Sequence, residues 1–406
     1  MNVLHIVAGE LTGGAAKGAY WLHLGLNDIG FNSKILTTSK KNYQRSERKF
    51  TINKNKINKG FSLIRSNINN LFLLPYKNRD KRIFSTGIFG YDFTKTDLYK
   101  WADIINLHWI NGGFVNIKDL SKVDKPIVWT VRDMWPMTGG CHYSIDCDNY
   151  KTGCGNCEQL NSNHKYDLSR YVLWRKDKYL PDDIKIVGIS EWVSEIASES
   201  YLFKDNDIRT IYNNVGSEMF FPINKDVARN ILGINTNKKI LLAGAQNVES
   251  FYKGFDKYLE AIDKLDQKDY FLLFFGNADE ELLDTLGFEY KSLGFLYDEV
   301  SMRLTYSAAD VFVAPSIQEA FGKTIVESMM CETPVVCFDA TGPKDLVEHK
   351  ISGYKADPFS SNSLAEGIEW TVSNSESLSD LRKYSVGKFD NKVIAEEYKN
   401  LYQELV

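Results

Sequence analysis

Two glutamates eight residues apart, Glu319 and Glu327, mark the stretch of the sequence with the strongest chemical signal. The apolar run Val311–Val313 precedes them as an expected buried strand, and Glu327 lies inside an expected helix over Lys323–Cys331. Gly322 would let a ligand approach the backbone, and the free N–H groups of the helix start would bind phosphate. Glu327 would then accept hydrogen bonds from ribose hydroxyls, and Glu319 would reach a sugar. The alternative is that both are ordinary first-turn acids, which the helix dipole favours.

A lysine in a glycine-bearing loop is the second signal. Lys253 and Gly254 lie between an expected strand, Ile240–Ala243, and an expected helix, Lys257–Leu265, and Gln246 lies earlier in the same loop. This order of strand, loop, lysine and helix is typical of a diphosphate site, where the lysine supplies charge as the leaving group becomes negative. Taken alone, this pattern is better interpreted as a solvated loop lysine.

The first expected strand is followed by a glycine-rich turn that contains Gly13, Gly14 and Lys17. Its spacings fit neither a dinucleotide fingerprint nor a P-loop, so both a ligand-binding turn and a plain turn remain open. His108 ends the strand that begins at Ile104. It should therefore lie at the carboxyl edge of a sheet, where ligands bind in open α/β folds.

Four of the six cysteines fall within seventeen residues, in the pattern C-x5-C-x6-C-x2-C: Cys141, Cys147, Cys154 and Cys157. The closing CxxC with two more thiols nearby fits a structural zinc site, and the alternatives are two disulfides or free thiols. His142, beside the cluster, is a candidate substitute ligand. Cys331 and Cys337 are expected in the core.

The elements that must position these residues are short apolar strands alternating with helices. The expected strands are Val3–Val7, Ser33–Thr37, Ile104–His108, Ile127–Val131, Ile184–Ile189, Ile240–Ala243, Phe271–Phe275, Val311–Val313 and Thr333–Phe338. The expected helices include Ala16–Ile29, Trp192–Ser198, Lys257–Leu265, Ser301–Ala309, Lys323–Cys331 and Lys392–Leu405. Because strand–helix alternation implies parallel sheets and restarts near residue 240, we expect two doubly wound α/β domains that face an interdomain cleft.

The overall charge is close to balanced, with 49 Lys and Arg against 53 Asp and Glu and a net charge of −4 over 406 residues. This composition excludes a uniformly basic nucleic-acid binder. Residues 40–82 depart from it: thirteen basic and two acidic residues give +11 locally, so the rest of the chain carries −15. Apolar residues alternate with the basic ones, which indicates contact with anionic headgroups at a membrane surface. The alternative is a solvated loop and helix.

The sequence shows no apolar run of the roughly 18–20 residues that a membrane-spanning helix needs. The start of the chain, Met1–Ala8, has no basic region before its apolar residues and is interpreted as a buried strand rather than a signal peptide. With six cysteines in a long chain, we expect a reduced protein in the cytoplasm.

Several segments together resemble the retaining glycosyltransferases of family four, which have the GT-B fold. The resemblance covers nearly the whole chain. It is most specific over the E-x7-E region, Ala314–Glu327, and the Pro-Val-Val strand that follows it, Thr333–Val336. It extends to an interdomain segment, Asn213–Val215 with Phe221-Pro222, and to a Lys-Gly phosphate turn, Lys253–Phe255. Trp129–Trp135 with Thr138–Tyr143 resembles a subgroup found in bacterial polysaccharide clusters.

The resemblance implies a role for each matching residue. Glu327 would hold the donor ribose, Glu319 would contact the transferred sugar, and Lys253 would neutralise the diphosphate. Residues around the start of the helix would also bind sugar and phosphate: Phe321, Gly322, Lys323 and Thr324. The glycine-rich turn would lie at the donor–acceptor junction, with Gly13, Gly14 and Lys17. The family needs no metal for transfer, so no cofactor is expected beyond a structural zinc.

This sequence departs from the family pattern at three places. The usual Gly-Gly before the Pro-Val-Val strand is Cys331-Glu332-Thr333 here. The family usually has Arg or Lys near Gln246, so one of its two phosphate-binding cations is missing in this sequence. Arg132 stands where the family commonly has a histidine, so either Arg132 or His108 would hydrogen-bond the transferred sugar.

The expected function is therefore transfer of a sugar, with retention, from a nucleotide-diphosphate sugar to a saccharide acceptor. The acceptor would be lipid-diphosphate-linked, at the inner face of the membrane, in bacterial surface polysaccharide biosynthesis. The expected domains are an acceptor-binding domain over 1–212, with the basic segment 40–82 and a cysteine-rich insert 138–160, a donor-binding domain over 213–388, and a helix over 389–406 that packs back on the first. The alternatives are a nucleotide-sugar 2-epimerase of the same fold and an inactive sugar- or lipid-binding subunit.

Overall fold

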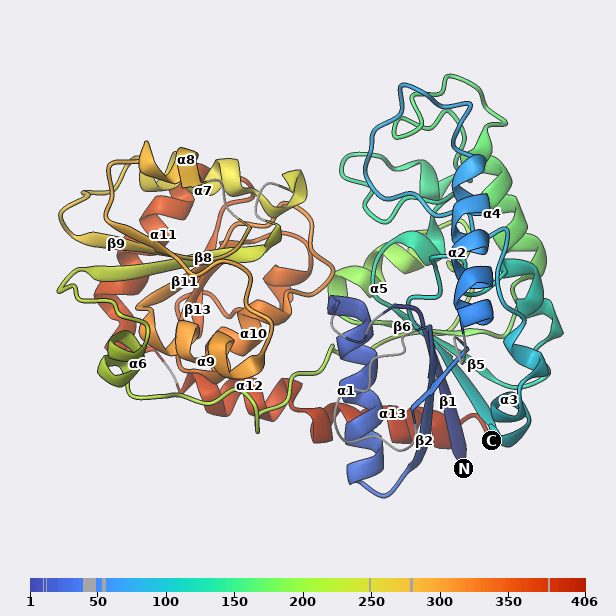
Figure 1. Cartoon of the computed structure of the whole chain (residues 1–406). Helices are drawn as coiled ribbons and strands as arrows, with labels where there is room; N and C mark the ends of the chain where they lie inside the picture. The colour runs from blue at the N-terminus through green and yellow to red at the C-terminus, as the bar shows by residue number, and fades with distance from the viewer. Residues whose placement is uncertain are drawn as a thin grey trace. The chain divides into compact units, whose positions relative to one another are not determined.

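A computed structural model describes residues 1–9, 11, 13–38, 49–52, 56–247, 250–277, 280–378 and 380–406. The chain divides into two compact units. Unit 1 comprises Met1–Asn213 and Asn391–Val406, and unit 2 comprises Asn214–Asp390. Both termini therefore belong to unit 1 (Figure 1). Parts of the predicted glycine-rich turn (residues 10 and 12) and of the predicted basic segment (residues 40–48 and 53–55) lie outside the described residues.

Unit 1 is built on a parallel sheet with strand order β3-β2-β1-β4-β5-β6-β7. Its central strands are runs of fully buried residues, as expected for strands that helices cover on both faces. The strands are β1 (Asn2–Val7), β2 (Asn32–Thr37), β3 (Lys49–Thr51), β4 (Ile104–Leu107), β5 (Ile127–Val131), β6 (Lys185–Gly188) and β7 (Ile208–Thr210). The α-helices are α1 (Gly14–Asp28), α2 (Lys56–Leu71), α3 (Asp97–Trp101), α4 (Leu168–Tyr179), α5 (Glu191–Ser198) and α13 (Asn391–Gln403).

The last helix, α13, completes the core of unit 1. Its buried face packs with side chains from β1, α1, β4, β5 and β6 in one cluster that includes Val3, Leu22, Ile104, Val128, Val187, Ile394, Tyr398 and Tyr402. Gly25 lets α1 and α13 approach closely, because a Cβ atom there would lie 2.7 Å from the Asn391 carbonyl oxygen. Two tyrosine hydroxyls of α13 also bind buried polar groups of the sheet: Tyr402 accepts from Asn106, and Tyr398 shares a hydrogen bond with Thr130.

Unit 2 repeats the plan with strand order β10-β9-β8-β11-β12-β13, all parallel. The strands are β8 (Lys239–Asn247), β9 (Tyr270–Asn277), β10 (Tyr290–Ser292), β11 (Val311–Ala314), β12 (Val335–Phe338) and β13 (Gly353–Ala356). The α-helices are α6 (Lys225–Ile231), α7 (Phe255–Ile262), α8 (Glu280–Asp284), α9 (Glu299–Ala308), α10 (Lys323–Met330), α11 (Ser361–Asn374) and α12 (Leu381–Phe389).

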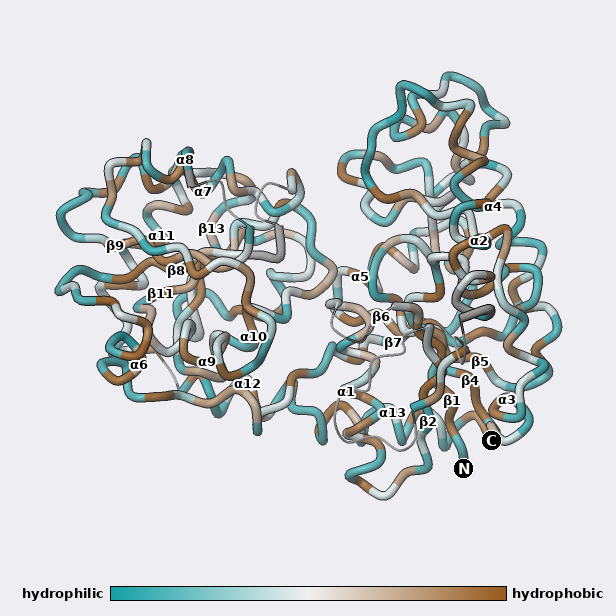
Figure 2. The backbone as a smooth tube through the Cα atoms, viewed as in Figure 1, coloured by the Kyte–Doolittle hydropathy of each residue, from teal (hydrophilic) through white to brown (hydrophobic). Residues whose placement is uncertain are grey.

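Hydrophobic residues follow the strands of both units and hydrophilic residues follow the outer loops (Figure 2). In unit 2, one buried cluster joins β8, β9, β11 and β12 to α7 and α11 through side chains such as Leu241, Tyr258, Phe274, Val313 and Leu364. The prediction of two doubly wound α/β units with parallel sheets is confirmed. Among the described residues, no helix is both long and apolar enough to span a bilayer.

Candidate functional site

The strand order of unit 2 reverses between β8 and β11, because the chain runs outward from β8 to β9 and β10 and then returns to build β11, β12 and β13 on the other side. In open α/β sheets, ligands bind outside the carboxyl ends of the strands at this switch point. The loops that follow β8 and β11 carry Lys253 and Glu319, so the fold brings two of the sequence-predicted site residues to the same edge.

The two loops are joined by backbone hydrogen bonds and by an ion pair. The Tyr252 carbonyl accepts from the Ile317 and Gln318 N–H groups at 2.9 and 3.2 Å. Lys253 Nζ lies 2.5 Å from Glu319 Oε2, and both side chains are about a quarter exposed, at 24% and 27%. Although burial opposes it, the Glu319 carboxylate raises the pKa of Lys253. Lys253 is therefore a charged ammonium group that an arriving phosphate can reach.

The turn at Gly254 requires a glycine. Its φ is +64°, and a Cβ atom there would lie 1.9 Å from the Pro315 carbonyl oxygen. The missing side chain lets the turn after Lys253 lie directly against the loop after β11. Gly254 also starts α7, which continues from the lysine-bearing turn.

We expect Gly254→Ala to destabilise unit 2 more than a glycine replacement that causes left-handed strain alone. Left-handed backbone costs an alanine about 1–2 kcal/mol, and the contact with Pro315 adds to that cost. Gly294→Ala is the matched control, because Gly294 has a similar φ of +63° with nothing within 4 Å of the added Cβ. Thermal unfolding of both variants measures the difference, and equal losses would mean that the close approach is unimportant.

The start of α10 lies on the β11 side of the switch point. Gly322 precedes the helix in the left-handed region, with φ +97°, and the first turn contains Lys323 and Thr324. Phe321 is buried, and its ring packs edge-on against Phe389 at 5.8 Å. Because the first N–H groups of a helix have no intrahelical acceptor, this end of α10 can donate to a phosphate or a sugar oxygen.

Glu327 lies one turn into α10 with its side chain buried. Its Oε2 accepts a hydrogen bond of 3.0 Å from the hydroxyl of Tyr306, a fully buried residue of α9. Burial and the nearby Glu327 raise the pKa of Tyr306, so this hydroxyl stays a donor. The sequence did not indicate Tyr306, because a contact between residues twenty-one apart on different helices has no local spacing signal.

The backbone of Gln246 is part of strand β8, whereas its side chain is outside the described part of the structure. The loop at Glu319 is supported by the turn that contains Thr341 and Gly342. The Gly342 N–H donates to the Glu319 carbonyl at 2.9 Å, and the Thr341 hydroxyl accepts from the Glu319 N–H at 3.3 Å. The backbone of Glu319 is thus held on both sides.

Unit 1 has its own switch point, between β1 and β4. The glycine turn leads from β1 into α1, where Gly13 is the N-cap residue and Gly14 the first helical residue. Lys17 lies one turn further, with its ammonium 4.8 Å from the ring centre of Trp21. His108 follows β4 at the same edge of the sheet. All of these predicted residues are therefore at the carboxyl end of the unit 1 sheet.

Arg132, directly after β5, is buried and contacts His108. Its Nε donates to His108 Nδ1 at 3.2 Å, and its Nη1 donates to Asn213 Oδ1 at 2.8 Å. Gly18 of α1 makes room for the guanidinium, because a Cβ there would lie 2.4 Å from Arg132 Nη1. Burial lowers the pKa of Arg132 to about 10, so it remains a cation at neutral pH.

The contacts of His108 fix its tautomer. Since Nδ1 accepts from Arg132, Nε2 carries the proton and donates to His5 Nδ1 at 2.9 Å. Burial lowers the pKa of both histidines well below the usual value of 6.5, and the nearby Arg132 cation lowers each of them further. With both ring nitrogens engaged and 2% exposure, His108 is placed to position Arg132.

The neutral His5–His108 pair predicts that unit 1 loses stability in mild acid. Below pH 6.5 the unfolded chain protonates these side chains whereas the folded chain does not, so the unfolded state gains up to about 1.4 kcal/mol per histidine per pH unit. Urea unfolding between pH 7.5 and 5.5 measures this through tryptophan fluorescence, because seven of the eight tryptophans lie in unit 1. His5→Gln should flatten the slope, whereas the same change at the exposed His164 should not. Stability that is independent of pH would contradict a neutral pair.

His142 binds partners other than the cysteines, which corrects the interpretation of it as a substitute metal ligand. Its Nδ1 lies 2.6 Å from Asp133 Oδ2, and its Nε2 lies 2.9 Å from the Ser85 hydroxyl. Trp109 Nε1 also donates to Asp133 at 2.9 Å. A serine, a histidine and an aspartate are thus connected in series beside the carboxyl ends of β4 and β5. The sequence did not indicate this network, because its members come from three separate loops.

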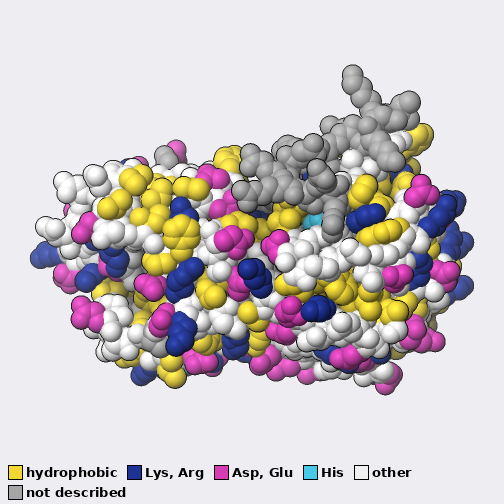
Figure 3. Space-filling view, turned by 90° about the horizontal axis from the view of Figure 1, so that it is seen from below, with side chains coloured by type: hydrophobic (Ala, Val, Ile, Leu, Met, Phe, Trp, Pro, Cys, Tyr) yellow, Lys and Arg dark blue, Asp and Glu magenta, His cyan; other side chains and the backbone are white. Residues whose placement is uncertain are grey.

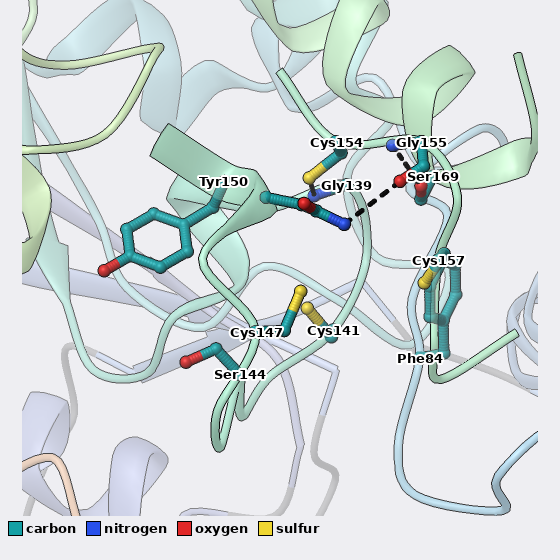
Figure 4. A pocket seen from close by; sticks show the side chains of 11 residues that line it. Phe84, Gly139, Cys141, Ser144, Cys147, Tyr150, Cys154, Gly155, Cys157 and Ser169 are labelled. Carbon is teal, nitrogen blue, oxygen red and sulfur yellow. Dashed lines mark hydrogen bonds between the residues drawn. The ribbon is translucent and has the colours of Figure 1, made fainter. Parts of the chain in front are cut away.

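The four clustered cysteines line one small cavity in unit 1, and all are free thiols (Figure 4). Cys331 and Cys337 are buried in unit 2, as predicted. Within the described ranges, no group of three His, Cys, Asp or Glu side chains is already gathered for a metal ion. The zinc interpretation of the cysteine cluster therefore stays a prediction.

The switch-point residues of unit 2 lie within a family match. Residues 224–387 match the family model of Glycosyl transferases group 1. The group 1 segment contains Lys253, Glu319, the start of α10 and Glu327, which are the sequence-predicted residues that meet at the β8–β11 switch point.

Two curated relatives extend the likeness beyond this segment. An uncharacterized glycosyltransferase of Methanocaldococcus jannaschii is 26% identical over 349 residues, which is 77% of this chain and 87% of the relative. The capsular polysaccharide biosynthesis glycosyltransferase CapM of Staphylococcus aureus is 28% identical over 169 residues, 40% of each chain.

Solved structures resemble the whole chain. The sucrose-phosphate synthase of Thermosynechococcus elongatus gives a TM-score of 0.71 at 17% identity and covers 100% of this chain and 99% of its own. Anabaena HepE, solved in complex with UDP-glucose, gives 0.65 at 17% identity and covers 100% of both chains. The fold of this chain is therefore that of the GT-B glycosyltransferases, as predicted.

Proposed function

We propose that this protein is a retaining glycosyltransferase that transfers a sugar from a nucleoside-diphosphate sugar to a saccharide acceptor. The observation that carries the proposal is the Lys253–Glu319 pair beside the start of α10, at the switch point of unit 2. A cation, the N–H groups of a helix start and a carboxylate are what a donor diphosphate and its sugar require. The family match over residues 224–387 supports the same assignment.

Lys253 and the first amides of α10 would act on the leaving group. As the bond from the anomeric carbon to the diphosphate breaks, negative charge develops on the departing phosphate oxygens. Prearranged cationic and N–H groups stabilise that charge more in the transition state than in the bound donor, which is how they accelerate transfer. The transfer step itself then needs no metal ion.

Retention would follow if the departing phosphate takes the proton of the acceptor hydroxyl, so that the acceptor attacks from the face that the phosphate leaves. Glu319 would then contact the transferred sugar and, in the free protein, keep Lys253 charged and oriented. In unit 1, Arg132 is the residue we assign to acceptor or sugar oxygens, because His108 and Asn213 hold its guanidinium in place.

We further propose that the acceptor is a lipid-linked saccharide of bacterial surface polysaccharide. The relative CapM acts in capsular polysaccharide biosynthesis, and helix α2 offers a membrane-binding face. Side chains along α2 and just after it are large, apolar and more than a third exposed: Phe61, Leu63, Ile64, Leu71, Phe72 and Leu74. They lie within the basic segment 40–82, whose charge complements anionic headgroups. On the face drawn in Figure 3, by contrast, acidic and basic side chains are intermixed.

The donor is tested first with a panel of UDP-, GDP- and dTDP-sugars. A bound donor raises the melting temperature, because it binds only the folded state. The donor that does so is then incubated with the protein with and without a lipid-linked acceptor, and the products are analysed for linkage and anomeric configuration. Transfer with retention supports the proposal, epimerised donor without acceptor would replace it by the 2-epimerase, and no stabilisation by any donor would refute it.

The membrane contact is tested by co-sedimentation with vesicles of anionic or neutral lipid. We expect binding to anionic vesicles that falls as salt rises, since surface charges are screened. Phe61→Ser with Ile64→Ser should weaken it. Absent binding, or binding equal on neutral vesicles, would contradict the assignment of α2.

A further inference from the structure

The cysteine cluster, defined as Cys141, Cys147, Cys154 and Cys157, surrounds a cavity of about 20 Å³. A cavity of this volume holds one particle of about the size of a water molecule. In Figure 4 the sulfurs of Cys141 and Cys147 lie next to each other, Cys154 enters from above, and Cys157 lies beside Phe84. Four thiols from a stretch of seventeen residues thus line one ion-sized space.

The lining selects the class of ion. It contains no aspartate, glutamate or histidine among the described residues, and its remaining members are aromatic, glycine, hydroxyl or amide residues. Hard cations such as Mg²⁺ and Ca²⁺ bind oxygen-rich sites, whereas thiolates bind zinc and other thiophilic metals. The donor set therefore fits a thiophilic ion.

The backbone around the cluster is folded tightly enough to hold the thiols together. Cys154, Gly155 and Asn156 all have positive φ, at +56°, +97° and +47°, so the chain reverses sharply between Cys154 and Cys157. A Cβ on Gly155 would lie 2.2 Å from the Lys165 carbonyl oxygen. The N–H of Gly139 donates to Cys154 Sγ at 3.2 Å, and such a bond favours the thiolate over the thiol.

A buried lysine lies beside the cluster. Lys176 of α4 has no exposed surface, and its Nζ donates to the carbonyls of Trp135 and, at 2.8 Å, Thr138. In the part of the chain that the structure describes, it has no carboxylate at ion-pair distance. Four thiolates around a divalent ion carry a net charge of −2, which is costly to bury, and a protonated Lys176 would offset part of it.

We propose that the cysteine cluster binds one thiophilic divalent ion, zinc in the cell, as a structural site of unit 1. Binding joins four sulfurs to the ion and releases four protons to solvent, with no change of oxidation state. Because the sulfurs are not yet gathered at coordinating positions, they turn toward the centre of the cavity as the ion binds, so that metal binding also stabilises the fold.

The test is elemental analysis of the full chain, purified without chelator, alongside two matched variants. We expect about one zinc per chain, as in a four-cysteine structural site. Cys154→Ser should lose most of this metal, whereas Cys337→Ser should retain it, because Cys337 is buried in unit 2 and outside the cluster. Loss of metal in both variants, or in neither, would overturn the assignment to this cluster.

A second measurement covers the case in which Cys154→Ser does not fold. Cobalt(II) added to metal-stripped wild-type protein should give a sulfur-to-cobalt charge-transfer band that saturates at one equivalent and is removed by zinc. Mass spectrometry of the same protein should find all thiols reduced. Two disulfides in the cluster, or no absorbance change with cobalt, would refute the metal site whatever the outcome for sugar transfer.

Discussion

Replacing Lys253 by alanine is expected to lower the turnover of sugar transfer by about 10²–10³, the usual loss when one prearranged group that stabilises a developing anion is removed. The charge of Lys253 is secured by Glu319 at 2.5 Å, and its ammonium is partly exposed beside the start of α10. The donor should still bind measurably, since the helix amides remain. The change should appear mainly in kcat.

Lys257→Ala is the control for the loss of one positive charge. Lys257 lies four residues away and pairs with Glu260 on the surface of α7, and surface pairs of this kind contribute at most about 1 kcal/mol. We expect it to leave transfer within about twofold, whereas Lys253→Arg should recover part of the turnover by restoring charge. Initial rates at saturating donor, with melting temperatures measured in parallel, separate loss of chemistry from loss of folding. Near-normal turnover of Lys253→Ala would refute the phosphate role.

Glu327→Gln is expected to weaken donor affinity by about 10–100-fold, because hydrogen bonds to a charged group contribute about 1.5–3 kcal/mol. The amide keeps the shape of the side chain and can still accept from Tyr306, so the fold should be preserved. If Glu327 holds two ribose hydroxyls through its charge, the loss appears in the dissociation constant of the nucleotide as well as of the intact donor.

Tyr306→Phe separates this binding role from a structural one. It removes the same hydrogen bond of 3.0 Å from the opposite side and leaves the carboxylate in place. We expect it to cost about 1 kcal/mol of stability and to change donor affinity much less than Glu327→Gln does. Calorimetric titration of both variants with nucleoside diphosphate decides the question, and a Glu327→Gln affinity within twofold of wild type would mean that the buried carboxylate serves only the packing of α9 and α10.

The central strands of both sheets were predictable from the sequence and the edge strands were not. The strands β1, β4, β5, β8 and β11 are apolar runs that helices cover on both faces, and the sequence predicted each of them within a few residues of its bounds. The strands β3, β7, β10 and β13 lie at the four sheet edges. At an edge, fewer neighbours bury the side chains. Tyr290–Ser292 and Ile208–Thr210 are accordingly half-buried and partly polar, so they give no continuous apolar signal.

The candidate site was predictable where the chemistry lies in one loop. Lys253 and Glu319 each follow a predicted strand, and parallel strands bring their carboxyl ends to one edge. Side chains that contact the site from distant elements gave no spacing signal in the sequence. Tyr306 reaches Glu327 from another helix, and His142 was interpreted from its neighbouring cysteines although its ring binds Asp133 and Ser85.

The return of α13 to unit 1 makes that unit discontinuous in sequence, with the whole of Asn214–Asp390 between its parts. During synthesis, the apolar surface around Val3, Leu22 and Val128 therefore stays without its cover until Asn391–Val406 has left the ribosome. A chain that stopped near residue 390 would leave this surface of the unit 1 sheet exposed to aggregation and proteolysis. Unit 2, by contrast, is one uninterrupted stretch, which makes it the natural fragment to express alone for studies of donor binding.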